Sequence, residues 1–371
     1  MEGASSRFRP ASRNRRREGI SLPRFHGKTA DRLRLFLLLG LLFLAGCRQG
    51  AAPPQAWPDA QRDPLFPQPV SADIAAEQRK IVLGFSQLGS ESDWRNANTR
   101  SIKEAAREAG IELLFENAEQ SQEKQIEAIR GFIERKVDVI AFAPVIETGW
   151  EGILTEAKQA GIPVILFDRA VQIRDPSLYV TFIGADFYEE GRKAGKYLLD
   201  NMRNTPGPVV IAELEGTEGS SPSIDRGRGF RDVIQSRSDM SIVYSAPADF
   251  TVEQGKDVMR RFLQESGGRI DVLFAHNDDM ALGAIEAIEE FGLRPGEDIV
   301  IISVDGTRKA FEKMVEGKIN CVVECNPLLG PILMQAVREI TEGRTLPKRI
   351  VPPESVFTEV LAEKEVANRQ Y

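Results

Sequence analysis

The sequence predicts an α/β protein with two doubly wound parallel-sheet domains and a cleft between them. From residue 80 onward, short apolar strands alternate with helices, which is the pattern of parallel sheets covered by helices. The strands are continuous runs of Val, Ile and Leu, as in sheets buried on both faces. The alternation repeats in two successive halves of similar size, and two such halves predict two domains that enclose a ligand cleft.

Each half supplies its own strands and helices. In the first half we predict strands at 81–85, 111–115, 137–142 and 162–167 and helices at 96–109, 121–135 and 150–160. After a strand at 179–183, the second half has predicted strands at 209–212, 242–244, 272–274 and 299–302 and helices at 188–202, 223–236, 252–264 and 280–291. Gly110 ends the first helix, and Ile126, Ile129 and Phe132 lie on one face of the second.

The charge distribution argues against nucleic acid as a partner. The 371 residues are 42% hydrophobic and 28% charged, which is ordinary for a soluble two-domain protein. The net charge is −7, but residues 1–46 carry ten Arg and Lys against three Asp and Glu, a net of +7, which leaves −14 for the rest. A strongly acidic chain after residue 46 would repel the phosphates of nucleic acid.

The cysteines and histidines are few. Cys321 and Cys325 lie on a predicted strand at 319–325, where four residues span about 13 Å, too far for a disulfide between them. We therefore expect two free, buried thiols. With only His26 and His276 as imidazole ligands, we expect no metal site.

Motifs for nucleotide chemistry are missing from the sequence. No Gly-x-Gly-x-x-Gly follows a strand, no Walker loop occurs, and the Gly-containing run 226–230 lies at the start of a helix. We therefore predict no cofactor and no enzyme activity. Hydrolysis by a pair of carboxylates is the alternative, but most carboxylates here are expected to pair with Arg.

The N-terminus has the pattern of an export signal. Leu35–Ala45 is an apolar run of eleven residues, too short to span a bilayer and typical of a signal-peptide core, and Arg32 and Arg34 precede it. The run ends in Leu44-Ala45-Gly46-Cys47, which resembles the bacterial lipobox. That resemblance implies a signal peptide at 1–46, cleavage before Cys47 and lipid attachment to its thiol. A buried helix with a chance Cys is the alternative.

Residues 47–79 differ in composition from the body. Six prolines and little periodic apolar pattern predict a semi-rigid tether between membrane and body.

Polar and aromatic residues follow the ends of most strands. In a parallel sheet these ends share one edge, where ligands bind. The candidates in chain order are Glu91, Trp94, Arg95, Asp168, Arg169, Asp186, Arg226, Phe250, His276, Asn277, Asp278, Asp279, Asp305 and Glu324. An aromatic ring packs on the C–H face of a sugar, while carboxylates accept from its hydroxyls and guanidinium groups donate to them. The set therefore favours a small polyhydroxylated ligand.

Several of these residues have a structural alternative. Asp186, Asp278 and Asp279 precede or open helices and could cap them. Asp168 and Arg169 could form a self-satisfied pair, and Trp94 and Phe250 could be core residues. For His276 we favour a structural role beside the site.

The motifs at these positions carry a family resemblance over about residues 80–360. They are Gly84–Arg95, Ala143-Pro144, Thr148–Glu151, Leu166–Arg169, Pro247–Phe250, Ala275–Ala284 and Asp305-Gly306. In them the chain resembles the type I periplasmic sugar-binding proteins of ABC importers, the family that includes the ribose binders. The resemblance implies two lobes, at 80–185 plus 326–353 and at 186–325 plus 354–371, joined by a three-crossover hinge near Ala185, Asn326 and Pro353.

The same resemblance implies how the site residues act. Trp94 would stack on the sugar, and Asp168 and Arg169 would grip ring hydroxyls. Arg226, Phe250, Asn277 and Asp305 would close over the other face. Glu91 and Glu324 complete the implied set, although the alignment of their loops can slip by a residue. Arg95 matches the Trp-Arg of furanose-binding members, which makes galactofuranose the first expectation, with ribose, arabinose and galactose next.

The expected function is therefore capture of a monosaccharide by hinge closure, and delivery to ABC permease subunits in the membrane. We expect an exported monomer, lipid-anchored to the outer face of the cell membrane or in the periplasm. A receptor that presents sugar to a sensor kinase shares the fold and site. A ligand-binding transcription regulator would need a helix-turn-helix before residue 80, where this chain has a signal and a tether.

Overall fold

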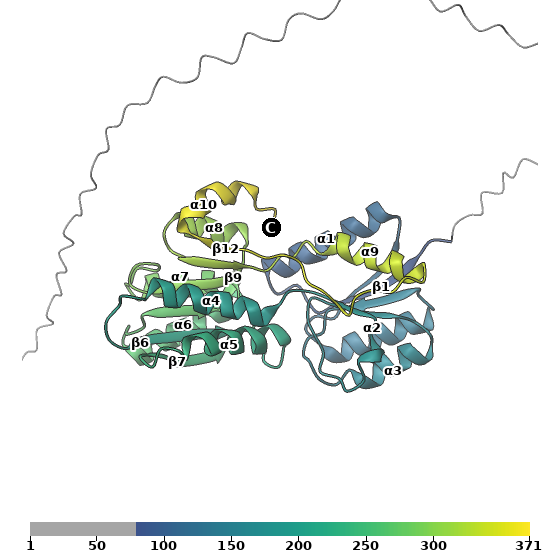
Figure 1. The fold of residues 1–371 in the computed structure, drawn as a ribbon, viewed down its shortest axis with the longest axis horizontal. Helices are drawn as coiled ribbons and strands as arrows, with labels where there is room; N and C mark the ends of the chain where they lie inside the picture. Colours follow the sequence, from purple (N-terminus) through teal and green to yellow (C-terminus); the bar gives the residue numbers. More distant parts are fainter. Residues whose placement is uncertain (1–78) are drawn as a thin grey trace, which may run out of the picture. The chain divides into compact units, whose positions relative to one another are not determined.

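The computed structural model describes residues 79–371, which form two parallel α/β sheets (Figure 1). The first sheet has the strand order β11-β5-β4-β3-β1-β2. Its strands are β1 (Val82–Gln87), β2 (Glu112–Asn117), β3 (Val139–Phe142), β4 (Val164–Phe167), β5 (Thr181–Ile183) and β11 (Arg349–Ile350). All of its pairings are parallel, as the continuous apolar strands predict.

The second sheet has the order β12-β10-β9-β8-β6-β7. Its strands are β6 (Val209–Glu215), β7 (Met240–Pro247), β8 (Val272–Ala275), β9 (Val300–Asp305), β10 (Cys321–Glu324) and β12 (Val356–Thr358). Only β12 runs antiparallel, against β10. The predicted fold class, with two doubly wound parallel-sheet domains, is confirmed.

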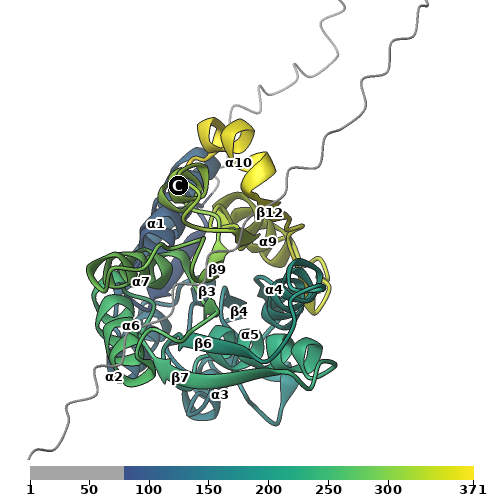
Figure 2. The same ribbon diagram turned by 90° about the vertical axis from the view of Figure 1, so that its left-hand side faces the viewer.

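Helices cover both faces of each sheet. They are α1 (Asp93–Ala109), α2 (Gln122–Glu134), α3 (Glu151–Gln159), α4 (Phe187–Asn201), α5 (Ser221–Ile234), α6 (Val252–Ser266), α7 (Asp278–Glu290), α8 (Arg308–Val315), α9 (Gly330–Thr341) and α10 (Glu359–Glu365). Helices α1 and α9 cover one face of the first sheet, and α2 and α3 the other. In the second sheet α4 and α5 lie opposite α6 and α7 (Figure 2). We call the first sheet with α1, α2, α3 and α9 the first lobe, and the second sheet with the remaining helices the second lobe.

The helix that opens the site shows how local sequence sets the boundaries. The Ser92 hydroxyl accepts a hydrogen bond from the Arg95 N–H and so caps the N-terminus of α1. At the other end, Gly110 adopts φ 66°, a left-handed conformation in which a side chain would be strained. Buried Ile102, Ala105 and Ala106 lie on the face of α1 that packs into the core.

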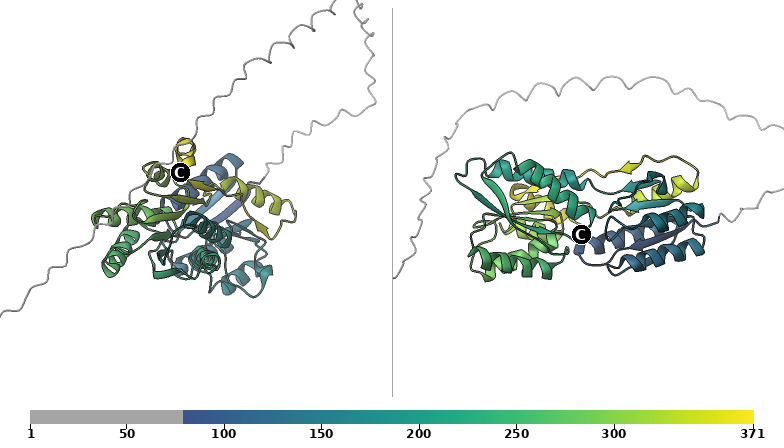
Figure 3. Two further views of the ribbon diagram at one scale, coloured as in Figure 1. Left: turned by 60° about the vertical axis from the view of Figure 1, so that its left-hand side comes forward. Right: turned by 90° about the horizontal axis from the view of Figure 1, so that it is seen from below.

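The chain passes between the lobes three times, through residues 184–186, 325–329 and 351–355. The C-terminal segment, yellow in Figures 1 and 3, supplies α9 and β11 to the first lobe and β12 and α10 to the second. The three-crossover topology implied by the resemblance is thus present. The exact lobe boundaries stay predictions, and the predicted signal peptide, the tether up to residue 78 and Cys47 lie outside the described residues.

The state of the cysteines agrees with the prediction, but several helices and strands were missed. Cys321 and Cys325 are free and buried, as expected. Helices α8, α9 and α10 and strands β11 and β12 were not predicted; the two strands have only two and three residues, too few for a periodic pattern. Across residues 79–371, no helix is both long and apolar enough to cross a membrane.

Candidate functional site

A small pocket lies between the two lobes, at the carboxyl ends of strands from both sheets. Nine of the ten predicted ligand-binding residues line it: Glu91, Trp94, Arg95, Asp168, Arg169, Arg226, Phe250, Asn277 and Asp305. Ser92, Phe187, Pro222 and Cys325 line it as well and were not predicted. Ser92, Phe187 and Pro222 lie within about one helical turn of a candidate residue, and Cys325 comes directly after β10. Their neighbours in the sequence were the signal that could have found them.

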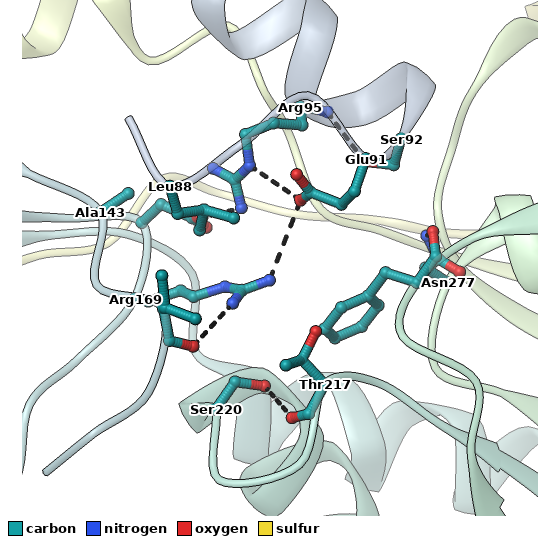
Figure 4. A network of polar contacts seen from close by, with 12 residues as sticks. Leu88, Glu91, Ser92, Arg95, Ala143, Arg169, Thr217, Ser220 and Asn277 are labelled. Carbon is teal, nitrogen blue, oxygen red and sulfur yellow. Dashed lines mark hydrogen bonds and ion pairs between the residues drawn. The ribbon is translucent and has the colours of Figure 1, made fainter. Parts of the chain in front are cut away.

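The first-lobe side of the pocket is a buried network of two arginines and two carboxylates. Figure 4 shows one of the carboxylates, Glu91, between Arg95 and Arg169. Arg95 Nε lies 3.1 Å from Glu91 Oε1, and Arg95 Nη2 lies 2.6 Å from Asp168 Oδ2. Burial by itself lowers the pKa of Arg95, but the charges of Asp168 and Glu91 outweigh it and raise that pKa. Arg95 is therefore a fixed cation with both partners in place.

Arg169 is much less satisfied than Arg95. Its Nη1 donates to the backbone oxygen of Val145 at 3.0 Å, and its Nη2 lies 4.0 Å from Glu91 Oε1. Burial, followed by repulsion from Arg95, lowers the pKa of Arg169 to about 10. In the described part of the chain, Arg169 Nε and Glu91 Oε2 have no hydrogen-bond partner although both are buried. A ligand hydroxyl can accept from the first and donate to the second.

The second-lobe side is organised around Arg226. Its Nε lies 2.7 Å from Glu190 Oε2, its Nη1 donates to the backbone oxygen of His276 at 2.6 Å, and its Nη2 lies 3.8 Å from Asp305 Oδ1. Burial opposes the charge of Arg226, but Glu190 outweighs it and raises the pKa. For Asp305, burial raises the carboxyl pKa well above its usual range despite the opposing charge of Arg226.

Besides Phe187, the two predicted aromatic rings line the pocket, Trp94 at 5% and Phe250 at 4% exposure. The indole Nε1 of Trp94 donates to the backbone oxygen of Cys325 at 2.6 Å, and the Arg95 guanidinium lies 4.7 Å from the ring centroid. The Arg169 guanidinium lies 5.2 Å from the centroid of Phe250. Both rings also pack into hydrophobic clusters, so the core and pocket interpretations hold together.

Backbone strain gathers at the pocket. Asp168, Phe250 and Asp305 have φ angles of 62°, 61° and 126°, in the region that favours glycine. Non-glycine residues adopt such angles only where the surrounding structure holds them, and they concentrate at binding and catalytic sites. Here the strain aims two carboxylates and one ring at the same pocket.

The helix-capping alternatives separate clearly. Asp186 caps α4 by accepting from the Glu189 N–H at 3.1 Å. At α7 the cap is Asn277, which accepts from the Met280 N–H at 3.0 Å, so the capping interpretation of Asp278 and Asp279 is wrong. Asp278 instead accepts from the Gly306 and Thr307 N–H groups at 2.8 and 2.7 Å.

Asp279 and His276 have other partners. Asp279 Oδ2 accepts from the Asp93 N–H at the start of α1, in the first lobe, at 3.2 Å. His276 Nε2 lies 3.0 Å from Glu213 Oε1, and both side chains are fully buried, which agrees with a structural role for His276. No local signal linked His276 to Glu213, because the two lie on different strand regions.

Glu324 does not line the pocket. Its Oε1 lies 2.8 Å from Arg369 Nη1, and its Oε2 accepts from the Ser355 N–H at 3.1 Å. The C-terminal segment lies near the end of β10, where Arg369 binds the Glu324 carboxylate. That contact joins residues far apart in the sequence, so the strand end alone does not reveal it.

Comparison with known proteins agrees with this architecture. A family model described as a periplasmic binding protein domain matches residues 83–345. The galactofuranose-binding protein YtfQ of Escherichia coli (strain K12) is 42% identical over 279 residues, covering 75% of this chain and 87% of that protein. The chain belongs to the periplasmic binding protein family.

Solved structures of the periplasmic binding protein fold match the same region. A crystal structure from Mycobacterium smegmatis in complex with beta-D-fucofuranose is 52% identical, with a TM-score of 0.77, covering 78% of this chain and 95% of that chain. The binding protein of the arabinose ABC transporter from Shewanella sp. ANA-3, bound to alpha and beta-L-arabinofuranose, is 44% identical, with a TM-score of 0.75 and coverage of 78% and 95%.

Proposed function

We propose that the protein is the sugar-binding component of an ABC importer and that it captures a monosaccharide in its furanose form, with galactofuranose as the first expectation. The observation that carries the proposal is the pocket between the lobes, which Trp94 also lines and where Glu91 Oε2 and Arg169 Nε are buried with no hydrogen-bond partner among residues 79–371. A ligand with several hydroxyl groups supplies the missing partners. The relatives whose names and titles mention furanose sugars support the ring form.

The charge arrangement favours a neutral ligand over an anionic one. Arg95 is paired with Glu91 and Asp168, and Arg226 is paired with Glu190. Because these two guanidinium groups already have carboxylate partners, they do not need the charge of an anionic sugar to compensate them. A buried polar site of this kind also rejects a sugar that lacks one hydroxyl, at about 1–3 kcal/mol for each group left unpaired.

Closure of the lobes is the proposed mechanism. The Ala170 N–H donates to Ser221 Oγ at 2.9 Å, and the Glu147 N–H donates to the Gly219 carbonyl oxygen at 3.0 Å, so the two lobes bond directly beside the pocket. A sugar that touches both lobes binds this closed form better and shifts the equilibrium toward it. The closed form would then dock on the permease subunits, with no covalent step and no cofactor.

Export and anchoring follow from the N-terminal sequence. We infer that the signal at 1–46 is cleaved before Cys47, and that a lipid on the Cys47 thiol holds the protein, as a monomer, at the outer face of the membrane. Cys47→Ser should move the protein from the membrane fraction to the soluble fraction. A protein that stays in the membrane fraction after this change would contradict a lipid anchor at Cys47.

A thermal-shift screen of the purified protein against pentoses and hexoses tests the proposal. At least one sugar should raise Tm, and Trp94→Ala and Arg169→Ala should each abolish that shift. Arg135→Ala is the matched control, since Arg135 is exposed at the end of α2, and it should keep the shift. Retention of the shift in both pocket variants would place the site elsewhere, and turnover of the bound sugar would contradict a pure binding function.

A further inference from the structure

An acidic cluster lies behind the pocket, where the three connections between the lobes meet. Glu190 is on the first turn of α4, directly after the connection 184–186, Cys325 begins the connection 325–329, and Glu354 lies on the connection 351–355. One oxygen of each carboxylate and the Cys325 sulfur all lie within 4.8 Å of one another. Movement of one lobe relative to the other therefore acts on this cluster.

The two carboxylates of the cluster have too few partners for both to be charged. Glu190 Oε2 lies 2.7 Å from Arg226 Nε, whereas Glu190 Oε1 and Glu354 Oε1 are buried without a hydrogen-bond partner among the described residues. Lys193 does not fill the gap, because its Nζ donates to the backbone oxygen of Glu354 at 3.1 Å. An unpartnered buried charge costs several kcal/mol, so such a pair takes up a proton instead.

Every charged or titratable group that faces the pair agrees with a single shared proton. Arg226 on α5 compensates one negative charge, Lys193 on α4 is directed at the backbone of Glu354, and Asp305 at the end of β9, whose own pKa is raised, supplies no compensating positive charge. Burial, followed by repulsion from Glu190, raises the pKa of Glu354 to about 9. Burial also raises the pKa of the Cys325 thiol well above its usual value, so the sulfur is neutral.

A divalent cation in the same place fits less well. It would share Glu190 with the Arg226 guanidinium and so bring two cations onto one carboxylate. The donor set also mixes hard carboxylate oxygens with a soft, protonated sulfur. A proton requires neither compromise and leaves the Glu190–Arg226 pair intact.

We propose that Glu190 and Glu354 share one buried proton, and that this proton holds Arg226 in its position in the pocket and is taken up when the lobes close on a sugar. The second part rests on the proposed function. Glu354 is a positioning residue here, since it acts through Glu190 on Arg226 and does not line the pocket. Opening of the lobes moves the connection 351–355 and lets water reach Glu354, so its carboxyl holds the proton less tightly in the open form than in the closed form.

The expected consequence is proton-linked binding. Between the ordinary pKa of a carboxyl group and about 9, sugar affinity should fall by up to about tenfold for each pH unit as pH rises. Calorimetric titration with a sugar found by the thermal-shift screen, at pH 7.5 in buffers of different ionisation heat, measures the protons taken up. The wild type should take up more protons on binding than Glu354→Gln, whose amide imitates the protonated carboxyl.

Two comparisons make this difference specific. Glu265→Gln removes an exposed carboxyl on α6 of the same lobe and should bind with the wild-type proton uptake. Asp279→Asn removes another carboxyl whose pKa is raised at the contact between the lobes, and the Glu354→Gln difference should persist in that background. Equal proton uptake by the wild type and Glu354→Gln would overturn the coupling of the proton to closure.

The shared proton is tested separately without sugar. Because the folded pKa of Glu354 is raised, its stabilising contribution is complete below the unfolded pKa and disappears as pH rises through about 9. Tm of the ligand-free wild type should therefore fall more steeply between pH 5 and 9 than Tm of Glu354→Gln. If no sugar binds but this difference appears, the proposed function fails and the shared proton stands. Parallel Tm curves, or a bound divalent metal whose removal by EDTA lowers Tm in the wild type alone, would overturn the shared proton.

Discussion

The indole Nε1 of Trp94 donates a hydrogen bond to the backbone carbonyl oxygen of Cys325 at 2.6 Å. Trp94 belongs to α1 of the first lobe, and Cys325 begins the connection that leaves the second lobe. The ring proposed to support the sugar is therefore also a tie across the hinge, and its orientation depends on how the lobes are placed. This double role separates the effect of removing the ring from the effect of removing only its N–H.

Trp94→Phe should weaken sugar binding without abolishing it. The phenyl ring keeps an aromatic face, but the hydrogen bond to Cys325 is lost and a buried carbonyl oxygen is left unpaired, at a cost of about 1–3 kcal/mol. Isothermal titration should show a loss of affinity of roughly 5- to 150-fold. Wild-type affinity in Trp94→Phe would show that this tie does not contribute to the closed form.

Asp279→Asn should flatten the pH dependence of stability near neutrality. Burial, followed by repulsion from Asp93 and Asp278, raises the pKa of Asp279 to about 7. A raised carboxyl pKa stabilises the folded form below the unfolded pKa, near 4, and this contribution disappears as pH rises through about 7. Thermal unfolding from pH 4 to 8 should show a smaller fall in Tm for the variant, whose amide oxygen still accepts from the Asp93 N–H. An identical fall in both proteins would mean that Asp279 is ionised throughout.

Gly216→Ala should displace Phe250 from the pocket. A Cβ atom at position 216 would lie 1.8 Å from Phe250 Cζ, so either the ring or the backbone must move. We expect a loss of about 1–3 kcal/mol in the free energy of unfolding and a clear loss of sugar affinity. Gly131→Ala in α2 is the matched control, because a Cβ there meets nothing within 4 Å and should stabilise the helix by up to about 1 kcal/mol. Wild-type binding by Gly216→Ala would remove Phe250 from the site.

Glu324→Gln should lower stability and leave sugar binding nearly unchanged. The Glu324 carboxylate holds Arg369, whose guanidinium lies 4.3 Å from the ring centroids of both Phe311 and Phe357. Weakening this pair should cost about 1–3 kcal/mol of unfolding free energy. Denaturant unfolding and titration of the same sample measure the two effects. A large loss of affinity at unchanged stability would instead restore Glu324 to the ligand set.

Local patterns in the sequence predict the fold class and most of the residues that line the pocket. Continuous apolar strands between helices predict parallel sheets, and parallel strands place their carboxyl ends on one edge. Trp94, Asp168, Arg226 and Asn277 could therefore be assigned to one site although they lie far apart in the chain. Short stretches of sequence are enough for this assignment, because they show local periodicity and the direction of each strand.

Only the tertiary structure decided which polar groups pair with one another. The contacts of Glu324 with Arg369, of Glu190 with Arg226 and of His276 with Glu213 each join distant segments, and side-chain direction at a strand end does not follow from spacing. The surroundings of Cys325 were likewise not visible in the sequence. The fold places this free thiol beside the pocket and close to the carboxylates of Glu190 and Glu354. The pKa of a buried group depends on the sum of burial and neighbouring charge, and both exist only once the chain has folded.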